Sequence, residues 1–298
     1  MTMKKKTLFE GVATALITPF NDGGIDYESF YRLINWQIES GVQALVVCGT
    51  TGESSTLSDS EHRDAITYAC KIAAGRVPII AGAGSNDTSY ALDLARCACA
   101  SGADALLCVT PYYNKCTQSG LIKMFTQIAD ASTVPVILYN VPSRTSMNIE
   151  PSTYAILADH PNIAAIKEAN GNIGQMVETM GLVGDKLDIY SGNDDQIVPM
   201  MAMGAKGVIS VLSNVLPKET VELCRKFFKG DVKGSAQMQL ELLPLIKALF
   251  SEVNPIPVKA AMHALGYCEN NIRLPLTEME EAHKAHLLEE MRKCGLNV

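Results

Sequence analysis

The fold follows from a stretch that reads Ser101-Gly102-Ala103-Asp104-Ala105-Leu106-Leu107-Cys108-Val109-Thr110. The pattern predicts the end of a helix, a glycine that supplies a left-handed turn, and an apolar strand. The same design recurs at residues 40–45 and 203–208. Units of this kind, repeated along a chain, are typical of alternating β/α architecture.

Eight short apolar runs are spaced along the chain, and each is followed by a helical pattern. Most are apolar nearly throughout, as parallel strands covered on both faces should be. The runs are Val12–Thr18, Ala44–Cys48, Pro78–Ala81, Ala105–Thr110, Pro135–Tyr139, Ile163–Lys167, Asp188–Tyr190 and Gly207–Val211. Eight such units favour a closed (β/α)8 barrel of the TIM-barrel class.

An open, doubly wound sheet is the alternative architecture. Its nucleotide-binding fingerprint is missing, because no G-x-G-x-x-G follows the first run and no G-x-x-x-x-G-K-[ST] occurs in the chain. The closed barrel is therefore the better prediction.

Two of the intervening segments carry the signals of a helix start. Asp26 precedes a stripe of apolar residues that ends before Gly41, and aspartate is a preferred N-cap residue. Ser58 has Glu61 three residues later, which is the spacing of a capping box. Helices are expected to begin at these two positions.

The two ends of the chain differ from its middle. Residues 217–298 are helical in pattern, without a strand signal, and are more than the last barrel helix needs. We therefore expect a barrel core over residues 1–216, and the last barrel helix with a helical extension over residues 217–298. Met1 to Lys6 are interpreted as a solvated basic tail, since Glu10 and Gly11 interrupt any signal-like apolar run.

Composition excludes several classes of protein. Hydrophobic residues make up 47% of the 298 residues and charged residues 19%, which permits a large core and argues against disorder. The net charge of -7 argues against a nucleic-acid binder. No run approaches the ~18 apolar residues of a membrane span. The nine cysteines, an odd number without a C-x-x-C pair, favour free thiols and a cytoplasmic location, and make a metal site unexpected.

Lys167 is the most informative residue at the carboxyl ends of the strands, where a (β/α)8 barrel places its active site. It closes an apolar strand, and removal of an ammonium group from water favours the neutral amine. A neutral lysine amine forms a Schiff base with a carbonyl substrate. The alternative is an ion pair with Glu168, although neighbours in a strand face opposite ways. The pattern alone leaves both interpretations open.

Four other residues on this rim suit the same chemistry. Tyr139 ends the preceding strand and is expected beside Lys167, where a phenol can shuttle protons, unless it is a core tyrosine. Thr50 and Thr51 follow a glycine, so they can hold a carboxylate or merely cap their loop. Arg144 is expected on a loop past Pro142 and suits bidentate carboxylate binding, with a surface ion pair as the alternative.

Four motifs occur in order at the expected strand ends. They are Gly49-Thr50-Thr51-Gly52-Glu53-Ser54, Pro111-Tyr112-Tyr113-Asn114, Tyr139-Asn140-Val141-Pro142-Ser143-Arg144-Thr145 and Ile166-Lys167-Glu168. Together they resemble the dihydrodipicolinate synthase family of the pyruvate-dependent aldolases, and the resemblance runs from about Thr7 to the C-terminal helices. It implies a lyase of lysine (diaminopimelate) biosynthesis that condenses pyruvate with L-aspartate 4-semialdehyde. It also implies that no cofactor is needed and that the enzyme is a homotetramer of two tight dimers.

The resemblance also implies roles for single residues. Lys167 forms the imine with pyruvate, while Tyr139, Thr50 and Tyr113 form a hydroxyl relay in which the tyrosine at 113 is lent across the dimer interface. Thr51 binds the pyruvate carboxylate and Arg144 the carboxylate of the semialdehyde. Gly192 and the carbonyl of Ile209 line the pocket.

A lysine feedback site is the last feature that the resemblance implies. Its matching positions are Ser54, Ser55, His62, Asn86 and Tyr112. Tyr90 and Asp59 depart from the glutamate and histidine that lysine-sensitive members usually carry there.

Two other functions compete with this interpretation. An N-acetylneuraminate lyase would share Lys167 and Tyr139, but Arg144 and the double tyrosine after Pro111 argue against it. An oxo-acid sensor without turnover is disfavoured by the complete set of lysine and hydroxyl groups.

Overall fold

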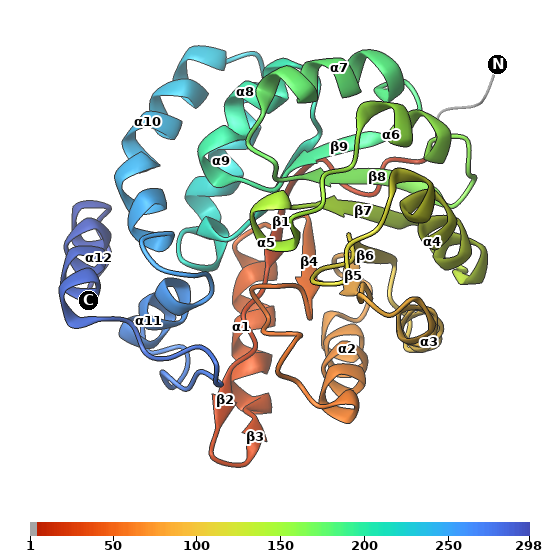
Figure 1. Ribbon diagram of the computed structural model, residues 1–298. Coiled ribbons are helices and arrows are strands. Elements are labelled where there is room, and N and C mark those ends of the chain that lie inside the picture. Colours follow the sequence, from red (N-terminus) through yellow and green to blue (C-terminus); the bar gives the residue numbers. More distant parts are fainter. Residues whose placement is uncertain (1–4) are drawn as a thin grey trace.

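Eight parallel strands close into a barrel, drawn at the centre of Figure 1. The computed structural model describes residues 5–298. The barrel strands are β1 (Gly11–Ala15), β4 (Ala44–Val47), β5 (Ile79–Gly82), β6 (Ala105–Val109), β7 (Val136–Asn140), β8 (Ile163–Glu168), β9 (Asp188–Ser191) and β10 (Gly207–Ser210). Successive strands pair with one another and β10 pairs with β1, so the predicted (β/α)8 barrel and all eight of its strands are confirmed.

A ring of helices surrounds the strands (Figure 1). The ring consists of α1 (Tyr27–Glu39), α2 (Asp59–Ala73), α3 (Thr88–Ala100), α4 (Gln118–Ala131), α6 (Pro151–Leu157), α7 (Ile173–Val183), α8 (Ile197–Ala202) and α9 (Pro217–Phe228). Shorter pieces lie in the loops: β2 (Phe20–Asn21), β3 (Gly24–Ile25), α5 (Pro142–Thr145) and the 3-10 turns η1 (Asp194–Gln196) and η2 (Leu212–Asn214). The sequence pattern did not predict the small hairpin of β2 and β3.

Both predicted helix starts are confirmed. The Asp26 side chain accepts hydrogen bonds from the N–H groups of Glu28 and Ser29. Ser58 and Glu61 form the reciprocal bonds of a capping box at the start of α2. These bonds satisfy backbone donors that the first helical turn leaves without partners.

The strands are apolar throughout because they are buried on both faces. In β4, Ala44 and Val46 belong to the cluster inside the barrel, whereas Leu45 and Val47 belong to the larger cluster between barrel and helices. Alternation along a strand produces this division, and it directs every second side chain toward the barrel axis.

The N-terminal segment differs from the predicted solvated tail. Lys5 is only partly exposed, and its Nζ donates to the carbonyls of Ala158, His160 and Ile163 at 2.7, 2.6 and 2.5 Å. Burial lowers the pKa of this lysine. The expectation was therefore wrong for Lys5, while residues 1–4 of the expected tail lie outside the described residues.

The C-terminal helices lie beside the barrel, in blue in Figure 1. They are α10 (Val232–Leu249), α11 (Ile256–Ala264) and α12 (Glu281–Lys293), and α10 packs against α9 and α12. The predicted helical extension after the eighth strand is confirmed.

No helix within residues 5–298 has the length and apolar character required to cross a membrane. All nine cysteines are free thiols.

Candidate active site

Lys167 and Tyr139 meet inside the mouth of the barrel. They are directly paired positions of β8 and β7, and the lysine Nζ lies 4.3 Å from the centre of the tyrosine ring. Only 6% of Lys167 and 7% of Tyr139 is exposed. The predicted neighbourhood of these residues is confirmed, and the lysine nitrogen is shielded from bulk water.

Glu168 does not pair with Lys167. Its carboxylate accepts hydrogen bonds from Asn140 Nδ2 at 3.0 and 3.2 Å and from Tyr154 Oη at 3.1 Å. Burial raises the pKa of Glu168 to about 7. The alternative of a Lys167–Glu168 ion pair is therefore wrong, because alternation along β8 turns the carboxylate away from the lysine.

Gly192 has no side chain, and its absence leaves room for the side chain of Lys167. A Cβ atom at this position would lie 3.1 Å from Lys167 Cε and 2.7 Å from Ala169 Cβ, so a larger residue would force the site to shift. Ile209 lies on β10 and belongs to the same inner cluster as Tyr139. Both positions are thus close to the mouth of the barrel.

Thr50 connects two cavities at this end of the barrel. It lines a small inner cavity of about 30 Å³ together with Tyr139, and an outer cavity of about 300 Å³ together with Arg144. Thr51 is buried, and its Oγ1 accepts a hydrogen bond from Asn254 Nδ2 at 3.0 Å. The Thr51 hydroxyl is therefore bonded to a distant segment and does not merely cap its own loop.

Arg144 lies in the short helix α5, and not on an irregular loop as the sequence suggested. Its guanidinium donates to the carbonyl of Asn254 at 2.9 Å and lines the outer cavity. The group is thus placed at the rim of the mouth, where an anionic substrate would enter.

Tyr113 lies apart from the other predicted catalytic residues. Its side chain is 91% exposed, and its φ of 69° is a left-handed conformation that a residue with a Cβ adopts only at a cost. Its neighbour Tyr112 lines the outer cavity instead. The structure therefore does not bring Tyr113 to Lys167 of its own chain.

The predicted effector positions are only partly brought together. Ser54, Ser55 and Tyr112 line the outer cavity, whereas His62 is buried and its Nε2 bonds to the carbonyl of Gly82. Burial lowers the pKa of His62. The backbone carbonyl of Asn86, the remaining position, accepts a bond from Asn114.

The two residues that depart from the effector pattern bond to each other. Tyr90 Oη donates to Asp59 Oδ1 at 3.0 Å. Arg63 also pairs with Asp59, and this arginine keeps the pKa of the Asp59 carboxyl below its ordinary value. The Tyr90 hydroxyl is therefore engaged within the protein.

Three residues that contact the site or its loop were not singled out from the sequence: Glu53, Asn254 and Lys259. Asn254 contacts both Thr51 and Arg144, and Lys259 forms a buried ion pair with Glu53. Lys259 could have been predicted as a buried lysine, because it lies in the apolar run of α11 just as Lys167 lies in an apolar strand.

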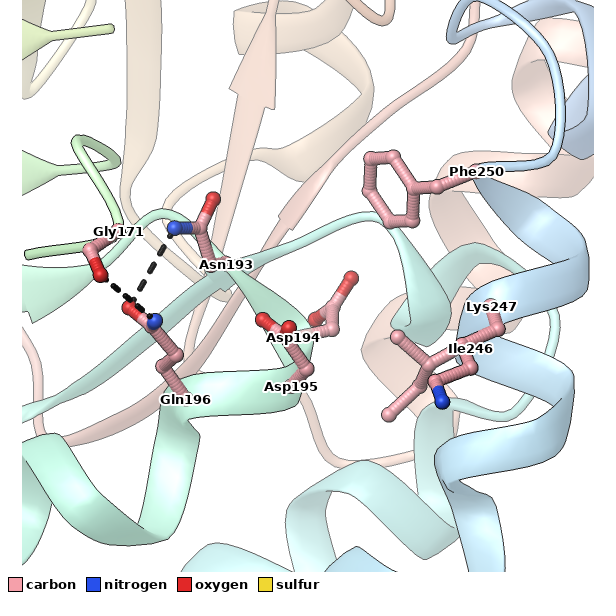
Figure 2. Close-up of a pocket in the computed structure, with 8 residues that line it drawn as sticks. All are labelled: Gly171, Asn193, Asp194, Asp195, Gln196, Ile246, Lys247 and Phe250. Carbon is pink, nitrogen blue, oxygen red and sulfur yellow. Dashed lines mark hydrogen bonds between the residues drawn. The ribbon is translucent and has the colours of Figure 1, made fainter.

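A further cavity of about 290 Å³ adjoins the mouth, between the barrel and α10 (Figure 2). Gln196 bridges one wall, where its side chain bonds to the Gly171 carbonyl and to Asn193, and the Phe250 ring faces it from the opposite wall. Asn193 directly follows Gly192, so this cavity begins one residue from the lysine stem. Among the described residues, no three His, Cys, Asp or Glu side chains gather as they would to hold a metal ion.

A closed (β/α)8 barrel with a buried lysine against a phenol at its mouth has the groups that a Schiff-base-forming barrel lyase requires. Residues 8–293 match the dihydrodipicolinate synthetase family, and the chain belongs to that family.

Individual relatives agree with this assignment over almost their whole length. The 4-hydroxy-tetrahydrodipicolinate synthase of Alkaliphilus oremlandii is 53% identical over 97% of this chain and 100% of its own. The crystal structure of the dihydrodipicolinate synthase from Aquifex aeolicus is 45% identical, with a TM-score of 0.95 over 97% of this chain and 99% of that one. The enzyme from Cyanidioschyzon merolae with lysine bound is 36% identical, with a TM-score of 0.95 over 98% of this chain and all of that one. The predicted family and the predicted class of enzyme, a lyase, are confirmed.

Proposed function

We propose that the chain condenses pyruvate with L-aspartate 4-semialdehyde through a Schiff base on Lys167, as a step of lysine (diaminopimelate) biosynthesis. The observation that carries the proposal is the buried contact between Lys167 and Tyr139 at the mouth of the barrel. The names of relatives that are about half identical to this chain, such as the 4-hydroxy-tetrahydrodipicolinate synthase of Alkaliphilus oremlandii, support the choice of substrates. The reaction needs no metal or organic cofactor, because the protonated imine itself withdraws electrons from the substrate.

The first half of the reaction forms the imine. The Lys167 amine adds to the keto carbon of pyruvate, and loss of water from the adduct gives the imine. Tyr139, whose ring centre lies 4.3 Å from the Lys167 Nζ, exchanges the protons that these steps require. Thr50 lines the inner cavity with Tyr139, which supports its role as the next hydroxyl of the relay.

The second half forms the carbon–carbon bond. Loss of a proton from the pyruvate methyl group gives an enamine, which attacks the aldehyde carbon of the second substrate. The amino group of that substrate then adds to the imine carbon, and the ring closes as the Lys167 amine leaves. One water molecule is released overall, and the lysine is regenerated.

Substrate carboxylates are assigned to two sets of groups at the mouth of the barrel. Thr51 and the N–H groups of its loop hold the pyruvate carboxylate, with Gly192 and the Ile209 carbonyl lining the pocket. Arg144 at the outer cavity holds the carboxylate of the semialdehyde, for which a guanidinium is suited.

Tyr113 serves the site of a neighbouring subunit in this proposal. Its nearly complete exposure and its strained backbone support an interface with a second copy, which would cover the ring and hold the loop. We accordingly propose a homotetramer of two tight dimers.

We also propose a cytoplasmic location, since nine free thiols suit a reducing compartment.

Lysine feedback is proposed at the positions Ser54, Ser55, His62, Asn86 and Tyr112, of which Ser54, Ser55 and Tyr112 line the outer cavity. The related structure from Cyanidioschyzon merolae with lysine bound supports an effector site in this family. Tyr90 has a neutral hydroxyl, bonded to Asp59, in place of the glutamate carboxylate that would hold a lysine ammonium. Inhibition by lysine is therefore expected to be weak.

Reduction with borohydride in the presence of pyruvate tests the central step. Mass spectrometry should find a reduced pyruvate adduct on Lys167, and a Lys167→Ala protein treated in parallel should carry none. Absence of the adduct from the native protein would falsify the Schiff-base mechanism. Supplying pyruvate with either aspartate semialdehyde or N-acetylmannosamine then separates the proposed activity from that of an N-acetylneuraminate lyase.

A further inference from the structure

Lys259 and Glu53 form an ion pair that is closed off from solvent. The Nζ–Oε1 distance is 2.6 Å, and the two side chains are 0% and 1% exposed. The lysine Nζ also donates to the carbonyl of Asn271 and lies 4.1 Å from the centre of the Phe20 ring. The second oxygen of Glu53 accepts a bond from the N–H of Arg273 at 3.2 Å. One carboxylate thus joins a barrel loop to α11 and to the segment that follows it.

Glu53 follows Thr50 and Thr51 in the loop between β4 and α2. The two threonines are flanked by two non-glycine residues in the left-handed conformation, Cys48 at φ 55° and Glu53 at φ 54°. A residue with a Cβ keeps such a conformation only where surrounding contacts hold it. The contacts of the Glu53 side chain therefore help to hold the turn directly after the two threonines, together with the backbone bonds of the turn itself.

Two further bonds hold the same loop. Thr18 Oγ1, three residues after the end of β1, donates to the carbonyl of Gly52 at 2.7 Å. Asn254 Nδ2 donates to Thr51 Oγ1 at 3.0 Å, from the residues just before α11. Of these three attachments, the bond from Thr18 comes from the segment after β1, and the bonds of Asn254 and Lys259 come from the C-terminal extension.

We propose that Lys259 is a positioning residue for the reaction, acting through Glu53 on the loop of Thr50 and Thr51. The inference rests on the proposed function, in which these two threonines serve the proton relay and the pyruvate carboxylate. Lys259 has no exposed surface and lines neither cavity of the mouth, so it acts on substrate through the loop alone. The C-terminal helices are then part of the catalytic apparatus.

The test compares Lys259→Met, Glu53→Gln and the double variant with the native enzyme. Methionine keeps most of the lysine stem but removes the charge. Each single change should lower kcat/KM for pyruvate by about 10- to 100-fold, because small displacements of binding groups have effects of this size. The double variant should be no worse than the poorer single variant, since both changes remove the same contact.

Hydrogen exchange of the backbone amides at residues 49–53 supplies a readout that does not depend on turnover. Exchange there should become about tenfold faster in Lys259→Met. Glu290→Gln is the matched control, because Glu290 is a buried carboxylate of α12 that is paired with Lys293. This control should alter thermal stability without changing kcat, KM or exchange in the loop.

The proposal is overturned if folded Lys259→Met keeps kcat/KM within twofold of the native value, or if the losses of the single variants multiply in the double variant. Should Lys259→Met fail to fold, the double variant decides, because it leaves no unpaired buried charge; native kinetics in that protein would be contrary to the proposal. A native enzyme that does not consume pyruvate refutes the proposed function instead. The exchange measurement still reports in that case whether Lys259 holds the loop.

Discussion

Tyr139 and Lys167 are paired residues of adjacent parallel strands, and the lysine nitrogen lies over the phenol ring. Their separation is set by strand register in the barrel wall, which is more rigid than a loop. The centre of the proposed chemistry is therefore positioned by the fold itself. The groups proposed to hold the substrate carboxylates, in contrast, lie on loops and on a short helix and depend on contacts outside the barrel.

The phenol prediction concerns Tyr139→Phe. Loss of the hydroxyl should lower kcat by about 100-fold or more, the range of a general acid–base group, while the stem of Lys167 stays in place. Steady-state kinetics with both substrates measure the effect. Tyr190→Phe is the matched control, because Tyr190 also pairs with Lys167 in register but donates its hydroxyl to the Phe9 carbonyl. Equal losses in the two variants would contradict a specific role for Tyr139.

The interface prediction concerns Tyr113. Tyr113→Phe should lose at least about tenfold in kcat without loss of folding, since the side chain is almost fully exposed in the single chain. Mixed with Lys167→Ala, it should regain activity, because a mixed dimer has one intact site, about half of the native number for a symmetric pair. Activity after subunit exchange checks this. Mixed dimers that stay inactive would exclude a shared site.

The pH prediction concerns Glu168, whose pKa is raised by burial to about 7. An unfolded glutamate has a pKa of about 4.3, so between these values the folded chain binds a proton that the unfolded chain lacks. The free energy of unfolding should fall as pH rises through this window, by up to about 1.4 kcal/mol per pH unit, and level off above it. Urea unfolding at several pH values measures the slope, which Glu168→Gln should remove. An unchanged slope in the variant would assign the dependence to other groups.

The feedback prediction concerns Tyr90→Glu. A carboxylate here can accept a charge-assisted bond from a lysine ammonium, so inhibition by lysine should strengthen by about tenfold. Titration of the initial rate with lysine measures the change. Tyr90→Phe removes the bond to Asp59 without adding charge, and it should not gain sensitivity. If phenylalanine sensitises the enzyme as much as glutamate does, release of Asp59 is the cause instead.

The barrel could be predicted because each of its strands is a short apolar run that is recognisable from local composition. Continuous apolar runs follow from burial on both faces. Consecutive strands of a β/α barrel are neighbours, so the sequence alone predicts that Tyr139 lies beside Lys167. Arg144 was expected on a loop and lies in a short helix, a difference that four residues of sequence do not decide.

The sequence pattern did not predict the contacts between segments that are far apart in the chain. Glu53 and Lys259 are 206 positions apart, and Thr51 and Asn254 are 203 apart, so no local periodicity connects them. The expectation that Lys5 is solvated was wrong for the same reason, because its partners are far away in the chain. A lysine near the chain end is typical of solvated tails, and only the folded chain brings three carbonyls around its ammonium group.

The attachment of Lys5 has a practical consequence for handling the protein. One of the carbonyls that it caps belongs to Ile163, the first residue of the strand that carries Lys167 at its other end. Trimming the amino terminus past this lysine would strip a donor from the base of the strand on which the reactive amine stands. Recombinant versions should therefore retain Lys5, and an affinity label joined ahead of it should leave its side chain unaltered.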